Sequence, residues 1–392
     1  VSSFVSLVRF RFSFQIDTNQ LSEQHGRPSS QHRLRFRGPT CSRRPRESGH
    51  KKGEISPERR GSLSLIGWNE NGFETMSSPG SSNGVATWVR ESNLLWYHRW
   101  VIRVLKAGPI PQHVAFIMDG NRRFAQKENI AKAEGHSKGF DKLSETLQWC
   151  QDIGIREVTV YAFSIENFKR TKEEVDTLMS LAREKFRKLL EERDKLHERG
   201  ICIRIIGNTA LLPEDIQRFL AEAVLITRNN TKAFLNVAFS YTSRDEMAHS
   251  IRTVAEGFAQ GKLQQDDIDE ELLSRCMYTK HGTNPDLLVR TSGEVRLSDF
   301  LTWQSESTVI YFTETLWPDF NVWQLFGAVF YYQRCHWQLG AGGKREIEAI
   351  ECESSVTDEK EREERVRRFL DDVERRDHES LVKLTGAISL EE

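Results

Sequence analysis

The residues of this sequence that are best suited to chemistry follow a short apolar run. In the segment HVAFIMDGNRRFAQ, apolar residues lead directly into one carboxylate, Asp119, which is followed by Gly120, Asn121 and the paired Arg122 and Arg123. The planar guanidinium groups of arginines bind phosphate oxygens through two hydrogen bonds at a time. A single carboxylate among such cations is typical of a magnesium ligand that shares a diphosphate with them. The segment therefore predicts an anion-binding site whose charges fit a magnesium diphosphate.

More polar residues follow other apolar runs along the chain. His136, in EGHSKG, lies at the expected start of a helix, whose N-terminal N–H groups can bind an anion. Any one arginine alone would be expected to form a surface ion pair, but five arginines at strand ends favour a binding site. The other candidates come from YAFSIENFKR and VRTSGEVRLSDF and are Ser164, Asn167, Arg170, Arg290, Arg296 and Ser298.

The familiar phosphate-binding motifs are missing from the sequence. It has no GxxxxGK[ST], no GxGxxG after an apolar run and no GxSxG, which argues against a P-loop, a dinucleotide-binding fold and a hydrolase elbow. The acidic run DDIDEE at 266–271 is similar to aspartate clusters that bind diphosphates through magnesium. Because acids before an amphipathic stretch usually cap a helix, we expect capping here.

From residue 112 to about 339, near-continuous apolar runs alternate with amphipathic segments. This pattern predicts an α/β fold with a mostly parallel central sheet flanked by helices. Ligands in such folds bind at the C-terminal ends of the strands, where we expect Asp119, Ser164, Gly207 and Arg290. Strands are expected at 113–118, 157–164, 201–207, 233–241, 286–292 and 309–312, and helices at 137–152, 172–198, 213–228, 244–258 and 322–338.

Composition divides the chain into four segments. The first is rich in Arg, Ser and Gly and is expected to be disordered or translated upstream sequence, with a transit peptide or a nucleic-acid-binding arm as alternatives. The last is a charged helical tail, expected either to contact another subunit or to stand free in solvent. The segments are residues 1–75, an amphipathic helix region at 76–108, the catalytic domain at 109–340 and the tail at 341–392.

The amphipathic stretch at 86–106 is rich in aromatic residues. Trp88, Leu95, Val101 and Leu105 can share one stripe of a helix that basic residues flank. Such a helix lies on a membrane surface or, more often, packs on its own domain. Both alternatives remain open at this point.

The overall composition excludes several classes of protein. The 56 Lys and Arg nearly balance the 57 Asp and Glu, so the whole chain shows no nucleic-acid bias. The six cysteines form no CxxC pair and no zinc spacing, which indicates a reducing compartment. No apolar run is long enough to span a bilayer.

Several motifs together resemble one family. HVAFIMDGNRRFA, GHSKG, YAFSIENFKR and DLLVRTSGEVRLSDFLTWQ, followed by LWPDF, resemble in order and spacing the signature regions of cis-prenyltransferases, over about residues 90–340. The resemblance is highly specific. It implies the cis-prenyltransferase fold with a hydrophobic product tunnel. It also implies a transferase that condenses isopentenyl diphosphate units onto farnesyl diphosphate, with Mg²⁺, to make the long-chain precursor of dolichol for protein glycosylation.

The resemblance also implies roles for particular residues. Asp119 matches the family's metal ligand and, with Asn121 and Arg123, its catalytic residues. Asn121 or a diphosphate oxygen can help to remove the proton, and the sequence does not choose between them. The implied allylic diphosphate site is Asp119, Gly120, Arg122, Arg123, His136, Ser164, Asn167 and Arg170. The implied isopentenyl diphosphate site is Arg290, Arg296 and Ser298.

The product tunnel implied by the resemblance needs apolar walls. The expected helix at 172–198 offers an apolar stripe that fits either the tunnel wall or an ordinary core face. Its members are Val175, Leu178, Met179, Ala182, Phe186 and Leu189.

Two departures from the family pattern point to a partner. Bacterial homodimeric members have glycine at the position of Arg122 and a metal-binding glutamate at that of Val309, and both changes are typical of eukaryotic catalytic subunits. We expect the missing glutamate to leave Asp119 with less support for the metal. Eukaryotic members also depend on a subunit related to the Nogo-B receptor, whose C-terminal RxG motif completes the site, whereas this chain ends GAISLEE.

We therefore expect an obligate heteromer, in peripheral contact with the cytosolic face of the endoplasmic reticulum membrane. Its interface is expected at 296–304, 309–312 and 322–338. There are two alternative functions. One is a non-catalytic partner of the same fold, against which the retained Asp119 and its two arginines argue, and the other is a nucleic-acid-binding protein that uses the basic N-terminus.

Overall fold

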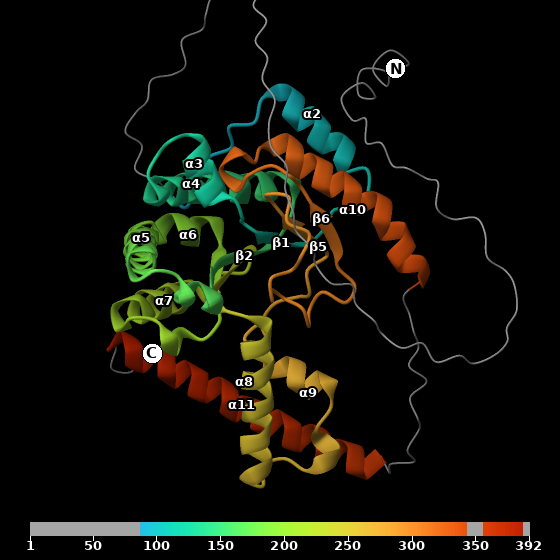
Figure 1. Cartoon of the computed structure of the whole chain (residues 1–392). Coiled ribbons are helices and arrows are strands. Elements are labelled where there is room, and N and C mark those ends of the chain that lie inside the picture. Colours follow the sequence, from blue (N-terminus) through green and yellow to red (C-terminus); the bar gives the residue numbers. More distant parts are fainter. Residues whose placement is uncertain (1–86, 343–355, 387–392) are drawn as a thin grey trace, which may run out of the picture. The chain divides into compact units, whose positions relative to one another are not determined.

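A six-stranded parallel sheet forms the centre of the protein (Figure 1). The computed structural model describes residues 87–342 and 356–386, so the expectation for residues 1–75 lies outside the described residues. The strand order is β3-β4-β2-β1-β5-β6, and every neighbouring pair is parallel, which confirms the predicted fold class. The strands are β1 His113–Ile117, β2 Glu157–Ser164, β3 Ile201–Ile206, β4 Ala233–Tyr241, β5 Leu287–Arg290 and β6 Val309–Phe312.

The central strands are apolar on both faces because helices or long loops cover both faces of the sheet. All five residues of β1 and all four of β5 are buried. Since the strands are parallel, their C-terminal ends share one edge. At that edge Ile117 pairs with Arg290, so the residues after β1 and β5 lie next to each other.

Helices fill the connections between the strands. They are α2 Trp96–Leu105, α3 Asn121–Lys127, α4 Lys132–Ile153, α5 Lys172–Glu191, α6 Arg193–Arg199, α7 Glu214–Thr227, α8 Ser243–Ala259, α9 Glu270–Arg275, α10 Val322–Gly342 and α11 Val356–Thr385. Two expected boundaries were wrong. The helix predicted at 137–152 begins five residues earlier, so His136 lies inside α4 and not at its start. The helix predicted at 172–198 is two helices, α5 and α6.

The break between α5 and α6 has a physical cause at Glu192. Its backbone (φ −94°, ψ 14°) leaves the helical region. Its carboxylate accepts hydrogen bonds from the backbone N–H groups of Trp88 and Val89, each at 3.1 Å. The segment before α2 therefore docks where the helix is interrupted.

The expected N-terminal helix is shorter than the sequence suggested. Trp88 and Leu95 precede α2, so they do not share its stripe. Trp88 is buried in a non-helical segment, and its indole N–H donates to the carbonyl of Lys185 at 2.7 Å. One face of α2 packs on α10, where the ring of Tyr97 stacks on Trp323. The helix thus packs on its own domain while Trp96 stays 79% exposed.

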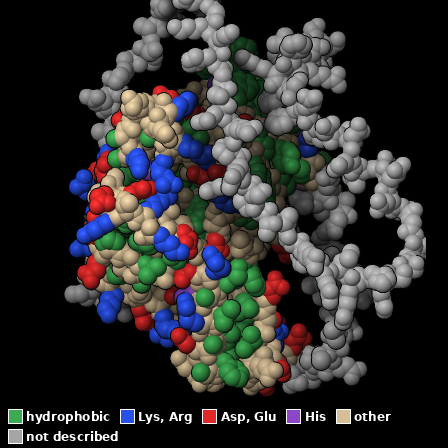
Figure 2. All heavy atoms as spheres, in the orientation of Figure 1, with side chains coloured by type: hydrophobic (Ala, Val, Ile, Leu, Met, Phe, Trp, Pro, Cys, Tyr) green, Lys and Arg blue, Asp and Glu red, His purple; other side chains and the backbone are tan. Residues whose placement is uncertain are grey.

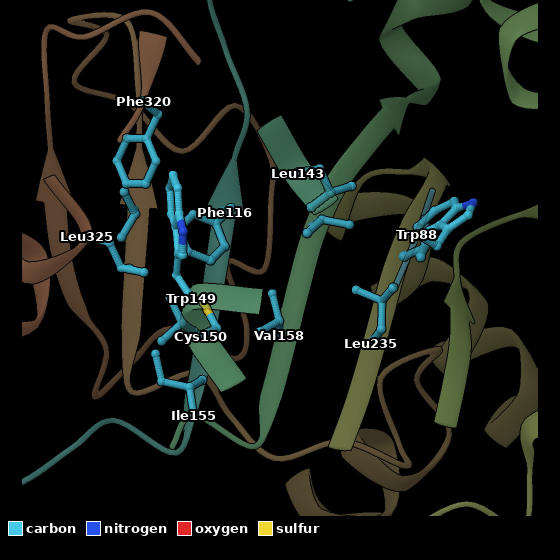
Figure 3. Packing of buried hydrophobic residues seen from close by; sticks show 14 of the residues in the cluster. Trp88, Phe116, Leu143, Trp149, Cys150, Ile155, Val158, Leu235, Phe320 and Leu325 are labelled. Carbon is cyan, nitrogen blue, oxygen red and sulfur yellow. The ribbon is translucent and has the colours of Figure 1, made fainter. Parts of the chain in front are cut away.

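The main core lies on one face of the sheet. Figure 3 shows Phe116 of β1 beside Trp149 of α4 and Phe320, while Leu235 of β4 and Trp88 lie at the other end of the cluster. A smaller cluster on the opposite face joins Ala238 of β4 with Phe300 and Leu301. The two clusters together bury the alternating residues of the strands.

The charged tail folds back on its own domain. On α11, Phe369 and Val373 are buried with Val254 of α8, so the expectation of a free helix in solvent is wrong. The expected cap is confirmed, because the Asp269 carboxylate accepts the N–H of Leu272 at 2.8 Å at the start of α9. Among the described residues, no helix is long and apolar enough to cross a membrane.

Candidate active site

The chain turns sharply at the end of β1, and this turn presents Asp119. Gly120 has φ +108°, and a Cβ there would lie 3.1 Å from the Cα of Leu316, so only glycine fits. The backbone of Asp119 is fixed on both sides: its N–H donates to the Thr291 hydroxyl at 3.0 Å, and its carbonyl accepts the N–H of Trp317, also at 3.0 Å. The turn therefore holds the carboxylate of Asp119 at the edge of the sheet.

Arg290, the last residue of β5, joins Asp119 to Ser298. Its guanidinium contacts the Asp119 carboxylate at 3.0 Å and donates to the Ser298 hydroxyl at 2.7 Å and to the Arg296 carbonyl. The Arg290 side chain is only 3% exposed, whereas that of Asp119 is 39% exposed. A buried guanidinium needs such partners, so these three contacts fix the position of the Arg290 side chain.

A second group of charges lies on the loop after β5. Arg123 donates to the hydroxyl of Ser292, and Glu294 pairs with both Arg123, at 3.5 Å, and Arg296. Ser292 and Ser298 have φ +83° and +51°, which are unusual values for serine. Such backbone strain is found where the surrounding structure fixes a functional loop.

Arg122 and Arg170 lie together near the start of α5. Glu174 contacts Arg170 at 2.8 Å and Arg122 at 3.6 Å through the same carboxylate oxygen. Burial and the charge of Arg122 lower the pKa of Arg170. Two guanidinium groups thus share one carboxylate, and the pair carries a net positive charge.

Ser164 and Asn167 support the turn that leads to Arg170. The Ser164 hydroxyl accepts the N–H of Glu166 at 3.2 Å, and the Asn167 side-chain oxygen accepts the N–H of Ser164 at 3.0 Å. These two side chains therefore cap each other's backbone.

Asn121 and His136 each bury a polar atom that has no hydrogen-bond partner among the described residues. These atoms are the side-chain oxygen of Asn121 and Nε2 of His136. Burial, together with the positive charges of Arg170 and Arg122, lowers the pKa of His136 to about 4. His136 is therefore neutral at physiological pH. A buried polar atom without a partner is unfavourable in the free protein and is common where a ligand binds.

Asn121 and His136 both line an apolar cavity of about 140 Å³. Of the predicted tunnel residues, Leu178, Ala182 and Phe186 of α5 line it. Met179 and Leu189 are buried in the core, so the expected stripe serves both as cavity wall and as core. Sequence reasoning missed Trp88, which also lines the cavity.

The register of β6 bears on the position where the family pattern has a glutamate. Val309 begins β6 and pairs with Leu287, which in turn pairs with Val114, five residues before Asp119. At about 3.3 Å per residue, this register places position 309 on the order of 16 Å from Asp119 along the strands. Within one chain, a glutamate at position 309 would not support Asp119.

The strand-end site carries a surplus of positive charge. Five arginines face three carboxylates, which are Asp119 and the two that the sequence did not reveal, Glu174 and Glu294. The described residues contain no cluster of three or more acidic, histidine or cysteine side chains that could bind a metal alone. The surplus of guanidinium groups can thus bind anions.

Comparisons with known proteins find similar sequences. Residues 117–340 match the prenyltransferase family model of undecaprenyl diphosphate synthases. The chain is 53% identical to the human dehydrodolichyl diphosphate synthase complex subunit over 250 residues, which is 64% of this chain and 75% of that protein. It is 44% identical to a tritrans,polycis-undecaprenyl-diphosphate synthase (geranylgeranyl-diphosphate specific) of Pyrococcus horikoshii over 225 residues, 57% of this chain and 85% of that protein.

A solved structure has the same fold. Lavandulyl diphosphate synthase from Lavandula x intermedia, in complex with dimethylallyl diphosphate, is similar with a TM-score of 0.54 and 32% sequence identity. The similarity covers 57% of this chain and 95% of that one.

Proposed function

The chain belongs to the undecaprenyl diphosphate synthase family of cis-prenyltransferases, and from this premise we propose how its strand-end site performs the family's reaction. The protein is a transferase that elongates a cis-prenyl chain to a polyprenyl diphosphate, the precursor of dolichol. Its first substrate is farnesyl diphosphate, onto which isopentenyl diphosphate units are condensed.

One observation carries the proposal. The surplus of arginines lies beside an apolar cavity, because His136 lines the cavity and also lies close enough to Arg170 and Arg122 for their charges to lower its pKa. An allylic diphosphate has this same division into a charged head and a hydrocarbon tail. We propose that its diphosphate binds the arginines while its chain enters the cavity.

The arginines divide into two sites. Arg122, Arg123 and Arg170, with His136, Ser164, Asn167 and the backbone at Gly120, form the proposed allylic diphosphate site. Arg290, Arg296 and Ser298 form the proposed isopentenyl diphosphate site, and Glu294 pairs with an arginine of each. Asp119 lies between the two because it contacts Arg290 and precedes the paired arginines of α3.

The residues present fit a magnesium ion only together with substrate. Asp119 offers a half-exposed carboxylate, and Mg²⁺ usually binds one or two carboxylates plus substrate phosphates and water. We propose Asp119 as its protein ligand. When bound, Mg²⁺ would neutralise charge that develops on the departing diphosphate.

The side chains of this chain then have separate tasks. Arg122, Arg123 and Arg170 stabilise the diphosphate as the allylic C–O bond breaks. The second site holds the isopentenyl double bond close to the allylic carbon, where the new C–C bond forms. One proton leaves the isopentenyl unit, and either the Asn121 oxygen or a diphosphate oxygen can help to remove it. The apolar walls keep water from the reactive carbon.

We propose that the active protein is a heteromer with a subunit related to the Nogo-B receptor. The name of the human relative describes a complex subunit, which supports a partner. The proposed interface comprises residues 296–304, β6 and α10. Figure 2 shows an apolar stripe over α8 and α9. The exposed apolar residues of α8 include Ile251 and Phe258, which are 57% and 50% exposed.

We also propose peripheral contact with the cytosolic face of the endoplasmic reticulum membrane. The outer surface of α2 and α10 combines exposed aromatic side chains, such as Trp96, Trp323 and Trp337, with the exposed Arg99 and Arg103. Aromatic rings and basic side chains favour an anionic lipid surface. Co-sedimentation with phosphatidylserine vesicles tests this proposal, and unchanged binding of a Trp96→Ala, Trp323→Ala variant would contradict it.

The decisive experiment compares the chain alone and with a Nogo-B-receptor-type partner. Each preparation is assayed with farnesyl and isopentenyl diphosphates and Mg²⁺. We expect strong activity only with the partner. Full activity of the isolated chain would overturn the heteromer, and inactivity of both would leave a non-catalytic role. Residues 76–392 should retain prenyl transfer, whereas a nucleic-acid function of the N-terminus would be lost.

A further inference from the structure

The loop that carries Ser298 has an unusual backbone. Ser298, Asp299 and Leu301 have φ values of +51°, +60° and +47°. Residues other than glycine rarely adopt this left-handed region, because their Cβ then lies too close to the following carbonyl oxygen. Such residues keep this conformation only where the surrounding structure fixes it. The contacts of this loop therefore determine where the Ser298 hydroxyl lies.

The start of α8 supplies these contacts at Asp299. The Asp299 carbonyl accepts the N–H of Ser243 at 2.8 Å. Its carboxylate accepts the backbone N–H of Arg244 at 3.3 Å and the Nε–H of the Arg244 side chain at 2.8 Å. Ser243 and Arg244 are the first two residues of α8, and their N–H groups have no partner within the helix. Asp299 therefore binds the start of α8 through its backbone and its side chain at once.

The other end of the loop is also attached to α8. The buried hydroxyl of Ser243 accepts the N–H of Thr302 at 2.8 Å. Between the two attachments, Phe300 and Leu301 are buried, and the Phe300 ring stacks on Tyr161 of β2 with the ring centroids 4.4 Å apart. The loop is thus held by α8 at both ends and by the core in the middle.

Ser298 lies directly before this attachment. Its hydroxyl accepts a hydrogen bond from Arg290 at 2.7 Å. Ser298 and Asp299 are joined by one planar peptide group, so a change of backbone angle at Asp299 moves the Ser298 side chain relative to Arg290. The carboxylate of Asp299 therefore controls the geometry of two residues of the proposed isopentenyl diphosphate site.

A carboxylate next to a diphosphate site would repel the substrate if its charge were unpaired. The Asp299 side chain is only 16% exposed, and it is paired with Arg244. The positive end of the α8 dipole offsets its charge further. Asp299 can therefore hold the loop without weakening the binding of an anion nearby.

We propose that Asp299 is a positioning residue for isopentenyl diphosphate. It acts through the Ser298 hydroxyl and not by contact with the diphosphate. This role rests on the proposed function, because Ser298 is taken as part of the isopentenyl diphosphate site. The proposed allylic site is built on other segments of the chain, so Asp299 should affect only one of the two substrates. A residue that merely caps α8 would change stability and neither KM.

Steady-state kinetics of the active preparation test this role. Asp299→Ala should raise the KM for isopentenyl diphosphate about tenfold, with kcat and the KM for farnesyl diphosphate within about twofold of wild type. Asp299→Asn should recover most of the loss, because its side-chain oxygen still accepts the N–H of Arg244 and asparagine tolerates the left-handed region. An equal rise of both KM values would overturn the role. So would a crystal structure of Asp299→Ala in which the Ser298 hydroxyl still binds Arg290.

Asp269→Ala is the matched control. Asp269 also accepts a helix N–H and pairs with an arginine, but it does so at the start of α9. This variant should lose stability and keep both KM values. A rise in the KM for isopentenyl diphosphate as large as that of Asp299→Ala would show that lost stability alone causes the effect. If Asp299→Ala does not fold, Asp299→Gly removes the same carboxylate contacts without backbone strain and is judged by the same outcomes.

Ser298→Ala separates this role from the proposed function. It should raise the same KM, and adding Asp299→Ala should have little further effect, because the hydroxyl that Asp299 positions is already absent. If Ser298→Ala leaves this KM unchanged, the proposed isopentenyl diphosphate site is wrong and the role of Asp299 is lost with it. If Ser298→Ala raises the KM and Asp299→Ala does not, only the role of Asp299 is wrong.

Discussion

Two regions of this protein bring aspartates and arginines together, and they use them in opposite ways. At the strand ends, five arginines face three carboxylates. Where α9 meets α11, Asp267 pairs with Arg365 at 2.9 Å and Asp269 pairs with Arg362. In the second region, each of these two acids has one arginine and each also accepts a backbone N–H.

The difference lies in the balance of charge and not in the residue types. In the second region each acid binds one arginine and one backbone N–H, so no charge remains unpaired to bind a ligand. These pairs hold α11 against α9 and the turn before it. A surplus of guanidinium groups on loops at a sheet edge remains available for an anion. The acidic run at 266–271 looks more like a diphosphate site in the sequence, yet the surplus lies around Asp119.

The largest effect should come from removing the carboxylate at the strand ends. Asp119→Ala should lower kcat/KM by about a thousandfold, because Mg²⁺ loses its ligand and Arg290 its counterion. Incorporation of labelled isopentenyl diphosphate with the partner present measures this. Asp266→Ala is the matched control, with expected activity within about twofold of wild type. Loss of activity in the control alone would reverse the comparison.

Acid should destabilise the protein at the same site, because burial and then the nearby arginines lower the pKa of His136. The pKa of His136 is lowered from about 6.5 to about 4, so between these values the unfolded chain binds a proton that the folded protein does not. Stability is therefore full above pH 6.5 and is lost as pH falls toward 4, by up to about 3 kcal/mol. Urea unfolding of wild type and His136→Gln across this range measures the difference. Equal pH dependence of the two proteins would contradict the assignment.

The sequence predicted where the strands end, but it did not predict which side chains from distant segments contact each other there. Apolar runs located the strands, and parallel strands place their ends together, so Asp119 and Arg290 could be brought to one edge. The sequence did not predict Glu174 or Glu294 as site residues. Glu174 contacts the arginines only because α5 turns that side of the helix toward them, and Glu294 does so only because of the strained backbone of the loop after β5. The break at Glu192 has no proline or glycine to mark it, and it depends on contacts with a segment about a hundred residues away.

In the second region, the buried pair should contribute stability without activity. The Asp267 side chain is fully buried, so Asp267→Ala leaves Arg365 and the N–H of Gln264 without a partner. The free energy of unfolding should fall by about 2 kcal/mol. Denaturant unfolding checks this, and kcat of the folded variant with its partner should be unchanged. A large loss of kcat would give the acidic run a role in the reaction.

The smallest effect should come from the cap of α9. Asp269→Ala removes the acceptor for the N–H of Leu272 and should lower the free energy of unfolding by about 1 kcal/mol. Asp269→Ser keeps a capping hydroxyl and should recover most of this loss. If Asp269→Ser is as destabilised as Asp269→Ala, the pair with Arg362, and not the cap, determines the contribution of Asp269.

The contact between Asp119 and Arg290 also has a consequence for biosynthesis. The two residues are 171 positions apart. At the usual rates of translation, Arg290 leaves the ribosome on the order of ten seconds after Asp119. During that interval β1 has no β5 beside it, and the carboxylate has no guanidinium partner. The nascent chain must therefore wait, with one edge of β1 unpaired, until the second half of the domain arrives. Truncated chains that end before β5 lack Arg290 and cannot form the site.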